Sequence, residues 1–255
     1  MNAERRQIIR DMLLSKPFVS FKEITDAFPD VSSMTIRRDI DFFESIGEVI
    51  KVRGGARSMK FITTSMEDAF SRRLDDNTVA KEKIAIKAME LIETGRSIFI
   101  DSGTTMLRFA TLLPDSRITV TTTGPNIALE LVKKSKPIVN LIGGMVTRDN
   151  ISVTGSQAMR YIDDINIDIA FIVPSGLSAK NGFTSGNYAE CELKRTIVRK
   201  ARKVIVLMDT SKLDKSLPYT FCGVNEVHTI ITDNTLPRDI SIAARDSGVR
   251  VIVAR

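Results

Sequence analysis

Two kinds of hydrophobic pattern follow one another along the chain. Up to about residue 57, apolar residues recur every three or four positions, which is typical of short amphipathic helices. From about residue 77, continuous β-branched runs alternate with amphipathic segments, as in strands buried on both faces of a parallel sheet and the helices that cover them. The pattern predicts an N-terminal helical domain over residues 1–57, a linker over 58–76 and a mainly parallel α/β domain over 77–255.

The first 57 residues predict three short helices followed by a β-ribbon. The first helix ends in the segment SKP, because Pro17 cannot continue it. In the second helix, Ser20 and Glu23 have the spacing of a capping box. The apolar residues of this second helix that we expect to face the core are Ile24, Ala27 and Phe28.

Ser32 is the expected N-cap of a third helix, in which Ile36, Ile40 and Phe43 lie at i, i+4 and i+7 and share one face. Gly47 ends that helix. The alternating segment EVIKVRGGA after it predicts a two-stranded wing. This order of elements is that of a winged helix-turn-helix, in which the second helix of the pair enters the major groove of DNA.

Burying that apolar face turns a polar and basic set of side chains toward solvent. Arg37 or Arg38 could bond a guanine with two hydrogen bonds, while the other binds a phosphate. Two solvated surface arginines are the alternative, because residues 1–60 hold eleven basic and nine acidic residues, a modest balance. A further alternative is that the winged helix contacts another protein. The residues that we expect to contact DNA are Ser32, Ser33, Met34, Thr35, Arg37, Arg38, Lys51 and Arg53.

The segment VSSMTIRRDIDFFESIGEVIKVRGGA resembles the N-terminal signature of the DeoR-type bacterial transcription regulators, V-S-x-x-T-I-R-R-D-L followed by H-G-G-A. Arg53 stands where that family commonly has histidine, which leaves the wing more basic. Later pieces, among them DSGTT, TVTTTGPNIAL, ELKR and DTSK, are similar to the family's effector domain, itself similar to the ribose-5-phosphate isomerase and CoA-transferase folds. The resemblance implies a repressor of a sugar or sugar-acid utilisation operon, induced by a phosphorylated sugar metabolite. Because operator half-sites are paired, we expect a homodimer or homotetramer on double-stranded DNA.

The segment SIFIDSGTTMLRF predicts a strand, a hydroxyl-rich turn and a helix N-terminus, which together favour a small anion. Neither a Walker A loop nor a GxGxxG fingerprint is present, so a phosphorylated metabolite is favoured over a nucleotide. By the resemblance, residues 102–105 would hold phosphate, whereas Asp101 would accept sugar hydroxyls or brace the turn. Lys194 and Lys212, which the resemblance also implies, could instead be ordinary exposed lysines of a helix and a loop. The implied effector residues are Asp101, Ser102, Gly103, Thr104, Thr105, Thr122, Asn126, Gly143, Gly144, Lys194 and Lys212.

Composition narrows the remaining classes of function. The single histidine, His228, excludes a zinc site with two histidines, and we expect no metal, no cofactor and no catalytic residue. The apolar runs are too short for a membrane span, and two cysteines fit a reducing cytoplasm, where we expect the protein to act. The alternative is a sugar-phosphate isomerase or CoA-transferase-like enzyme, which needs a carboxylate base. Candidate bases are Asp168, Glu190, Glu192 and Asp209.

Overall fold

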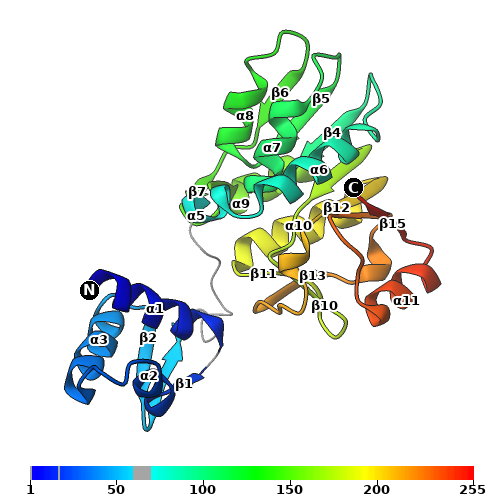
Figure 1. Ribbon diagram of the computed structural model, residues 1–255. Coiled ribbons are helices and arrows are strands. Elements are labelled where there is room, and N and C mark those ends of the chain that lie inside the picture. Colours follow the sequence, from blue (N-terminus) through cyan, green and yellow to red (C-terminus); the bar gives the residue numbers. More distant parts are fainter. Residues whose placement is uncertain (1, 17, 60–69) are drawn as a thin grey trace. The chain divides into compact units, whose positions relative to one another are not determined.

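The computed structural model describes residues 2–16, 18–59 and 70–255. The chain divides into two compact units, residues 1–65 and 66–255, and each is described by itself (Figure 1). The linker expected over residues 58–76 lies partly outside the described residues. At its described C-terminal end, the chain forms the short helix α5 (Phe70–Asp75).

The first unit packs three helices on a three-stranded antiparallel sheet with strand order β1-β3-β2. Its core includes Ile9, Ile24, Ile36, Ile40 and Phe43, all of them buried. The third helix therefore buries the face that the sequence predicts. The elements are α1 (Asn2–Ser15), β1 (Phe18–Ser20), α2 (Phe21–Ala27), α3 (Ser33–Ser45), β2 (Val49–Val52) and β3 (Gly55–Ser58).

Both predicted helix caps of this unit are confirmed. The Ser20 hydroxyl accepts a hydrogen bond from the Glu23 amide at 3.1 Å, and the Glu23 carboxylate accepts one from the Ser20 amide at 2.8 Å. Ser32 likewise accepts from the Thr35 amide, which starts α3. One prediction is wrong: Ala27 is exposed, because α2 is only seven residues long and Ala27 lies at its last position.

The second unit is built on a seven-stranded sheet whose neighbouring strands all pair in parallel, in the order β15-β14-β12-β9-β4-β5-β6. The strands lie in the part of the chain where the sequence shows continuous β-branched runs, so the predicted mainly parallel α/β fold is confirmed. The strands are β4 (Ser97–Ile100), β5 (Thr119–Thr122), β6 (Ile138–Leu141), β9 (Ile169–Ile172), β12 (Lys203–Leu207), β14 (Thr229–Thr232) and β15 (Arg250–Val253).

Helices cover both faces of the sheet, and strand β9 shows how. Ile169 and Phe171 pack into a core shared with α6, α7 and α8, whereas Ala170 and Ile172 pack into a second core shared with α9, α10 and α11. Successive side chains on a strand point to opposite faces, so a strand between two cores is apolar throughout. The helices are α6 (Thr78–Met89), α7 (Thr104–Leu112), α8 (Pro125–Leu131), α9 (Ser156–Asp163), α10 (Tyr188–Lys200) and α11 (Arg238–Asp246).

The short antiparallel strands of the second unit were not predicted from the sequence. Strands β7 (Met145–Thr147) and β8 (Ser152–Thr154) form a hairpin, and β10, β11 and β13 form a small sheet. Runs of three or four residues rich in glycine, serine and threonine carry too little periodicity to be read from the sequence. Within the described ranges, no helix combines the length and apolarity that crossing a bilayer requires. The remaining elements are β10 (Gly176–Ser178), β11 (Gly182–Ser185), β13 (Tyr219–Cys222) and the 3₁₀ turns Thr210–Lys212 and Val224–Glu226.

Candidate effector site and nucleic-acid interface

A pocket lies at the carboxyl ends of three neighbouring strands of the parallel sheet, β4, β9 and β12. The chain runs outward from β4 to β5 and β6, and then returns to place β9 on the other side of β4. Open α/β sheets bind ligands where the strand order reverses in this way. The described residues that line the pocket are Arg73, Lys81, Ser102, Gly103, Thr104, Thr105, Asn150, Val173, Pro174, Ser175, Lys194, Leu207, Met208, Asp209 and Lys212.

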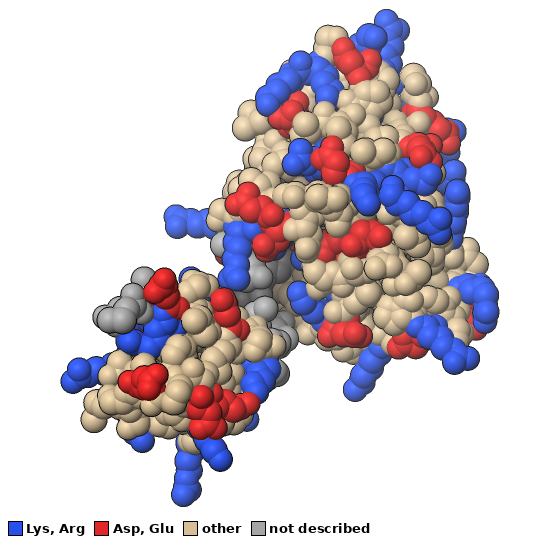
Figure 2. Space-filling model, viewed as in Figure 1, with Lys and Arg blue, Asp and Glu red and all other residues tan. Residues whose placement is uncertain are grey.

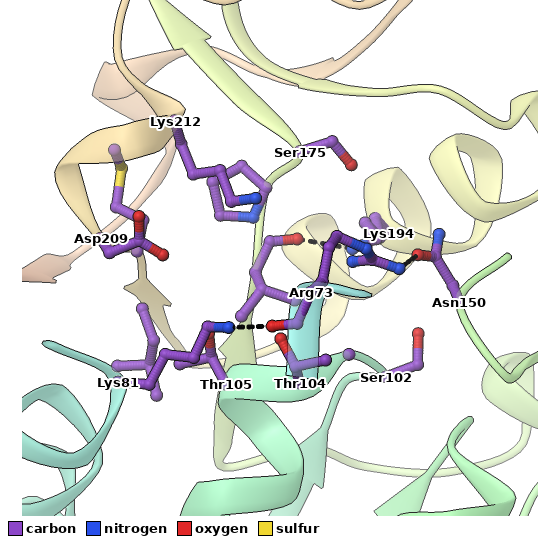
Figure 3. Close-up of a pocket in the computed structure, with 15 residues that line it drawn as sticks. Arg73, Lys81, Ser102, Thr104, Thr105, Asn150, Ser175, Lys194, Asp209 and Lys212 are labelled. Carbon is purple, nitrogen blue, oxygen red and sulfur yellow. Dashed lines mark hydrogen bonds between the residues drawn. The ribbon is translucent and has the colours of Figure 1, made fainter. Parts of the chain in front are cut away.

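Four basic side chains surround the pocket, from Arg73, Lys81, Lys194 and Lys212 (Figure 3). Lys81 and Lys194 are buried, and the other two are half-buried. Asp209 is the carboxylate among the described lining residues. Lys194 is ion-paired with Asp101, and the other three cations face one carboxylate, so the lining is electropositive. Partial burial limits the screening of these charges by water and salt.

Arg73 and Lys81 are held by contacts within the unit. The Arg73 guanidinium donates to the Asn150 side chain and, at 2.7 Å, to the Asp149 carbonyl. The Lys81 ammonium donates to the Arg73 carbonyl and, at 2.5 Å, to the Asp76 carbonyl, so it ties α6 to the end of α5 (Figure 3). Burial lowers the pKa of the Lys81 ammonium below its ordinary value.

The turn between β4 and α7 forms the floor of the pocket. Gly103 is the N-cap of α7 and has a φ of +116°, a conformation that side chains rarely adopt. A Cβ there would also come within 3.3 Å of the Val173 side chain. The hydroxyl residues Thr104 and Thr105 open the helix, whose first amides have no partner within α7. This helix N-terminus faces the same pocket as the basic side chains and adds to its preference for an anion.

Asp101 braces this turn and partners a buried lysine. One carboxylate oxygen accepts from the Ser102 amide at 2.9 Å, and the other accepts from the Val173 amide at 3.0 Å and from the Lys194 ammonium at 2.6 Å. Lys194 also donates to the Val173 carbonyl at 2.6 Å. Of the two roles open to Asp101 in the sequence, the geometry shows the bracing of the turn.

The structure places six of the eleven effector residues expected from the sequence in the lining of this pocket and leaves five out of it, of which Asp101 is bonded to the lining residue Lys194. Thr122 is buried at the end of β5, where its hydroxyl accepts from the Gly124 amide at 3.0 Å. Asn126 lies in the first turn of α8, and its side-chain amide is buried without a hydrogen-bond partner among the described residues. Gly143 and Gly144 are exposed between β6 and β7. The expected residues at the pocket are Ser102, Gly103, Thr104, Thr105, Lys194 and Lys212, with Asp101 bonded to Lys194.

Sequence reasoning missed Arg73, Lys81 and Asn150 as lining residues. A signal for Lys81 was present, because it lies three and four residues before Ile84 and Ala85 and therefore on the apolar stripe of α6. Lysine is almost never fully buried without a partner, so one on an apolar stripe indicates a polar site underneath. Arg73 carried no comparable signal, since its segment shows no clean period.

On the first unit, helix α3 presents Ser33, Met34, Arg37 and Arg38 to solvent, and Met34 is 59% exposed. Ser32 is exposed at the N-cap, whereas Thr35 is half-buried. The Arg37 guanidinium lies 5.0 Å from the centre of the Phe21 ring. Basic and acidic side chains are intermixed on the visible face of each unit (Figure 2). As candidates for DNA contact, the individual arginines of α3 are therefore more informative than the overall charge of that face.

The two expected wing residues differ in their surroundings. Arg53 is exposed in the turn between β2 and β3. The Lys51 ammonium bonds the Asp41 carboxylate and lies 3.4 Å from that of Glu44, both on α3. Lys51 would have to exchange these partners for a DNA phosphate.

A buried carboxylate on α3 ties this helix to α1. Asp39 accepts from Arg5 Nε at 2.7 Å and from Arg6 Nε at 2.8 Å. Burial by itself would raise the pKa of the Asp39 carboxyl, but the two guanidinium groups outweigh it and hold the pKa below its ordinary value. No pattern in the sequence indicates this pairing.

Comparison with known proteins identifies both units. The family described as "DeoR-like helix-turn-helix domain" matches residues 5–61, and the "DeoR C terminal sensor domain" matches residues 76–234. The HTH-type transcriptional regulator GlpR of Haloferax volcanii is 30% identical over 251 residues, 98% of this chain and 97% of the relative. The HTH-type transcriptional regulator IolR of Bacillus subtilis is 32% identical over 241 residues, 92% of this chain and 93% of the relative.

Among solved structures, ribose 5-phosphate isomerase A of Methanocaldococcus jannaschii is similar with a TM-score of 0.41 and 19% identity, over 56% of this chain and 57% of that one. The two family matches together cover most of the chain, and the relatives match it over nearly their whole lengths. The chain therefore belongs to the DeoR family of helix-turn-helix transcriptional regulators and carries that family's C-terminal sensor domain.

Proposed function

We propose that this regulator represses an operon for sugar or sugar-acid utilisation and leaves its operator when a phosphorylated metabolite binds the sensor domain. The observation that carries the proposal is the pocket at the end of β4, where four basic side chains meet the N-terminus of α7. A phosphate monoester brings a charge of about −1.5 to −2 and three strong acceptor oxygens. Lysine, arginine and helix amides are the donors that such a group requires.

The effector residues of the proposal are those of the pocket. The turn residues 102–105 and Lys212 contact the phosphate, together with Arg73 and Lys81. Lys194 supports the turn through its ion pair with Asp101. Thr122, Asn126, Gly143 and Gly144 stay predictions from the family resemblance, because they do not line this pocket.

The DNA contacts of the proposal lie on α3 and the wing. Arg37 and Arg38 contact a base edge and a phosphate, and Arg53 contacts the backbone beside the recognition helix. Ser32, Ser33, Met34, Thr35 and Lys51 complete the set as smaller contributors. Because one recognition helix reads only a few base pairs, the functional form is a homo-oligomer on paired half-sites.

Release requires a ligand that prefers the arrangement that cannot bind DNA. A preference of about 100-fold biases the equilibrium by about 2.7 kcal/mol.

The test is a gel-shift titration of the protein on DNA from its own upstream region, with sugar phosphates added. We expect at least one to release the DNA from the wild-type protein. Lys212→Ala should keep DNA affinity and lose release, whereas Lys180→Ala, an exposed lysine outside the pocket lining, should behave as wild type. Indifference of the complex to every sugar phosphate, or brisk turnover of ribose 5-phosphate by the protein, would contradict the proposal.

A further inference from the structure

A second, smaller cavity adjoins the cationic pocket. Ser102 and Lys194 line both, so the two spaces border the same side chains. The other walls come from the hairpin β7–β8, from the end of β5 and from α10. The cavity admits little more than one water-sized group, which is the size of a hydroxyl.

One wall of this cavity is the buried carboxylate of Glu190. Its oxygens accept from the Ser152 hydroxyl, from the Asn150 amide at 2.6 Å and from the Thr147 hydroxyl at 3.2 Å. These three donors hold the carboxylate in place, and all of them come from the β7–β8 hairpin. Glu190 precedes Lys194 by four residues, so α10 places both on its buried face.

Thr154 supplies a polar atom that is not satisfied. The residue is 1% exposed and lines the cavity, and its hydroxyl has no hydrogen-bond partner among the described residues. Buried polar groups in folded proteins are nearly always hydrogen-bonded, so the Thr154 hydroxyl requires a partner in the cavity, either a water or a polar atom of a ligand. A hydroxyl can both donate to and accept from Thr154.

We infer that this cavity receives a hydroxyl group of the effector, so that the effector is a neutral phosphorylated sugar or sugar alcohol and not a phosphorylated sugar acid. The inference rests on the proposed function, since it takes the phosphate to occupy the cationic pocket. It decides between two ligand chemistries that the sequence leaves open.

The charges explain why a carboxylate is excluded. Glu190 and Asp101 are both buried and both line the cavity, and Lys194 is already bonded to Asp101 at 2.6 Å. A carboxylate beside them would lose its hydration and meet a like charge at short range, which is costly where the local dielectric is low. A hydroxyl carries no charge and finds a partner in Thr154.

The experiment measures binding of matched phosphates to the full-length protein by calorimetry. The hexose set is glucose 6-phosphate, sorbitol 6-phosphate and 6-phosphogluconate, and the pentose set is ribose 5-phosphate, ribitol 5-phosphate and 5-phosphoribonate, with inorganic phosphate as the reference. In at least one set, the neutral compounds should bind tenfold or more tightly than both the acid and inorganic phosphate.

Two variants test the cavity itself. Thr154→Val keeps the shape and removes the hydroxyl, so affinity for the best neutral compound should fall about tenfold while that for inorganic phosphate stays unchanged. The variant should melt at or above the wild-type temperature, because a buried group without a partner is gone. In Glu190→Gln, the ratio of the affinity for the neutral compound to the affinity for its acid should be about tenfold smaller than in the wild type.

The outcomes separate this inference from the proposed function. If the acids bind as well as the neutral compounds, or Thr154→Val keeps the full preference over inorganic phosphate, the inference is wrong while the cationic pocket stands. If neither inorganic phosphate nor any of the six compounds binds, the proposed function fails and the inference fails with it.

Discussion

The Lys194 ammonium lies 2.6 Å from the Asp101 carboxylate, and both side chains are almost completely withdrawn from solvent. Removing one member of a buried ion pair leaves an uncompensated charge, which typically costs about 3–5 kcal/mol. Asp101→Asn should therefore lower the free energy of unfolding of the sensor unit by this order.

The double variant Asp101→Asn/Lys194→Met should lose less than the sum of the two single variants, because the orphaned charge is removed with its partner. Urea unfolding followed by the tyrosine signal reports on this unit, since Tyr161, Tyr188 and Tyr219 all lie in it. Additive losses would show that the two residues act independently. Asp163→Asn, at an exposed position on α9, is the matched control.

The arginines of α3 give a prediction for DNA binding. Arg37→Ala or Arg38→Ala should weaken operator binding by about 1–3 kcal/mol if the side chain reads a base. The variant that loses a phosphate contact should instead bind all DNA sequences more weakly by the same factor. The slope of its log affinity against log salt concentration should fall by about one counterion. Fluorescence anisotropy at several salt concentrations separates the two.

Arg245→Ala is the control for this experiment, because Arg245 is an exposed arginine of the sensor unit and its loss changes the net charge equally. If both α3 variants match this control in DNA affinity and in its salt dependence, α3 does not contact the DNA. The result would then favour the alternative that the winged helix binds another protein.

The two glycines of the wing should respond differently to alanine. A Cβ on Gly55 would lie 2.2 Å from the Val19 carbonyl, so β3 could not pair with β1. Gly54 has open space around it but a φ of +88°, which costs a side chain about 1–2 kcal/mol. Gly55→Ala should therefore prevent folding of the winged helix, and Gly54→Ala should only weaken it. Amide hydrogen exchange of residues 18–59 measures both, and equal protection in the two variants would contradict the close approach.

The pairing of Asp39 with Arg5 and Arg6 predicts a pH dependence. Its folded pKa lies below the unfolded value, so the stabilisation is complete above the unfolded pKa and is lost as pH falls through the folded pKa. The winged helix should hold its stability down to about pH 4 and lose it below. Asp39→Asn should have a lower free energy of unfolding at pH 7, and this free energy should depend less on pH in acid. NMR signals of α1 and α3 can follow the unfolding of both proteins. An unchanged acid profile would show that other carboxylates control this transition.

The parallel sheet was predictable because its strands lie between two cores. Each residue of β9 is buried on one face or the other, and the sequence therefore shows a continuous apolar run. The caps Ser20 and Ser32 were predictable because capping depends on residues three apart. Local rules of this kind need no knowledge of what packs against the segment.

Only part of the pocket could be predicted, because its lining residues are far apart in the sequence. The turn after β4 has a local signature, but Arg73 and Asn150 come from segments separated from it by tens of residues. Lys194 lies three and four residues before Ile197 and Val198, on the apolar stripe of α10, so the sequence does indicate that it is buried. Its partner Asp101 lies 93 residues earlier in the chain, and no local pattern indicates that pairing.

The residues that line the pocket from the strand side all sit at or beyond the ends of β4, β9 and β12, while the register of these strands is set by apolar pairs below them. Asp101 braces its turn, and Leu207 and Met208 belong to the cores, whereas the side chains of Ser102 and Ser175 do neither. Exchanges at positions of this second kind can change what the rim of the sheet binds while the strands below keep their pairing.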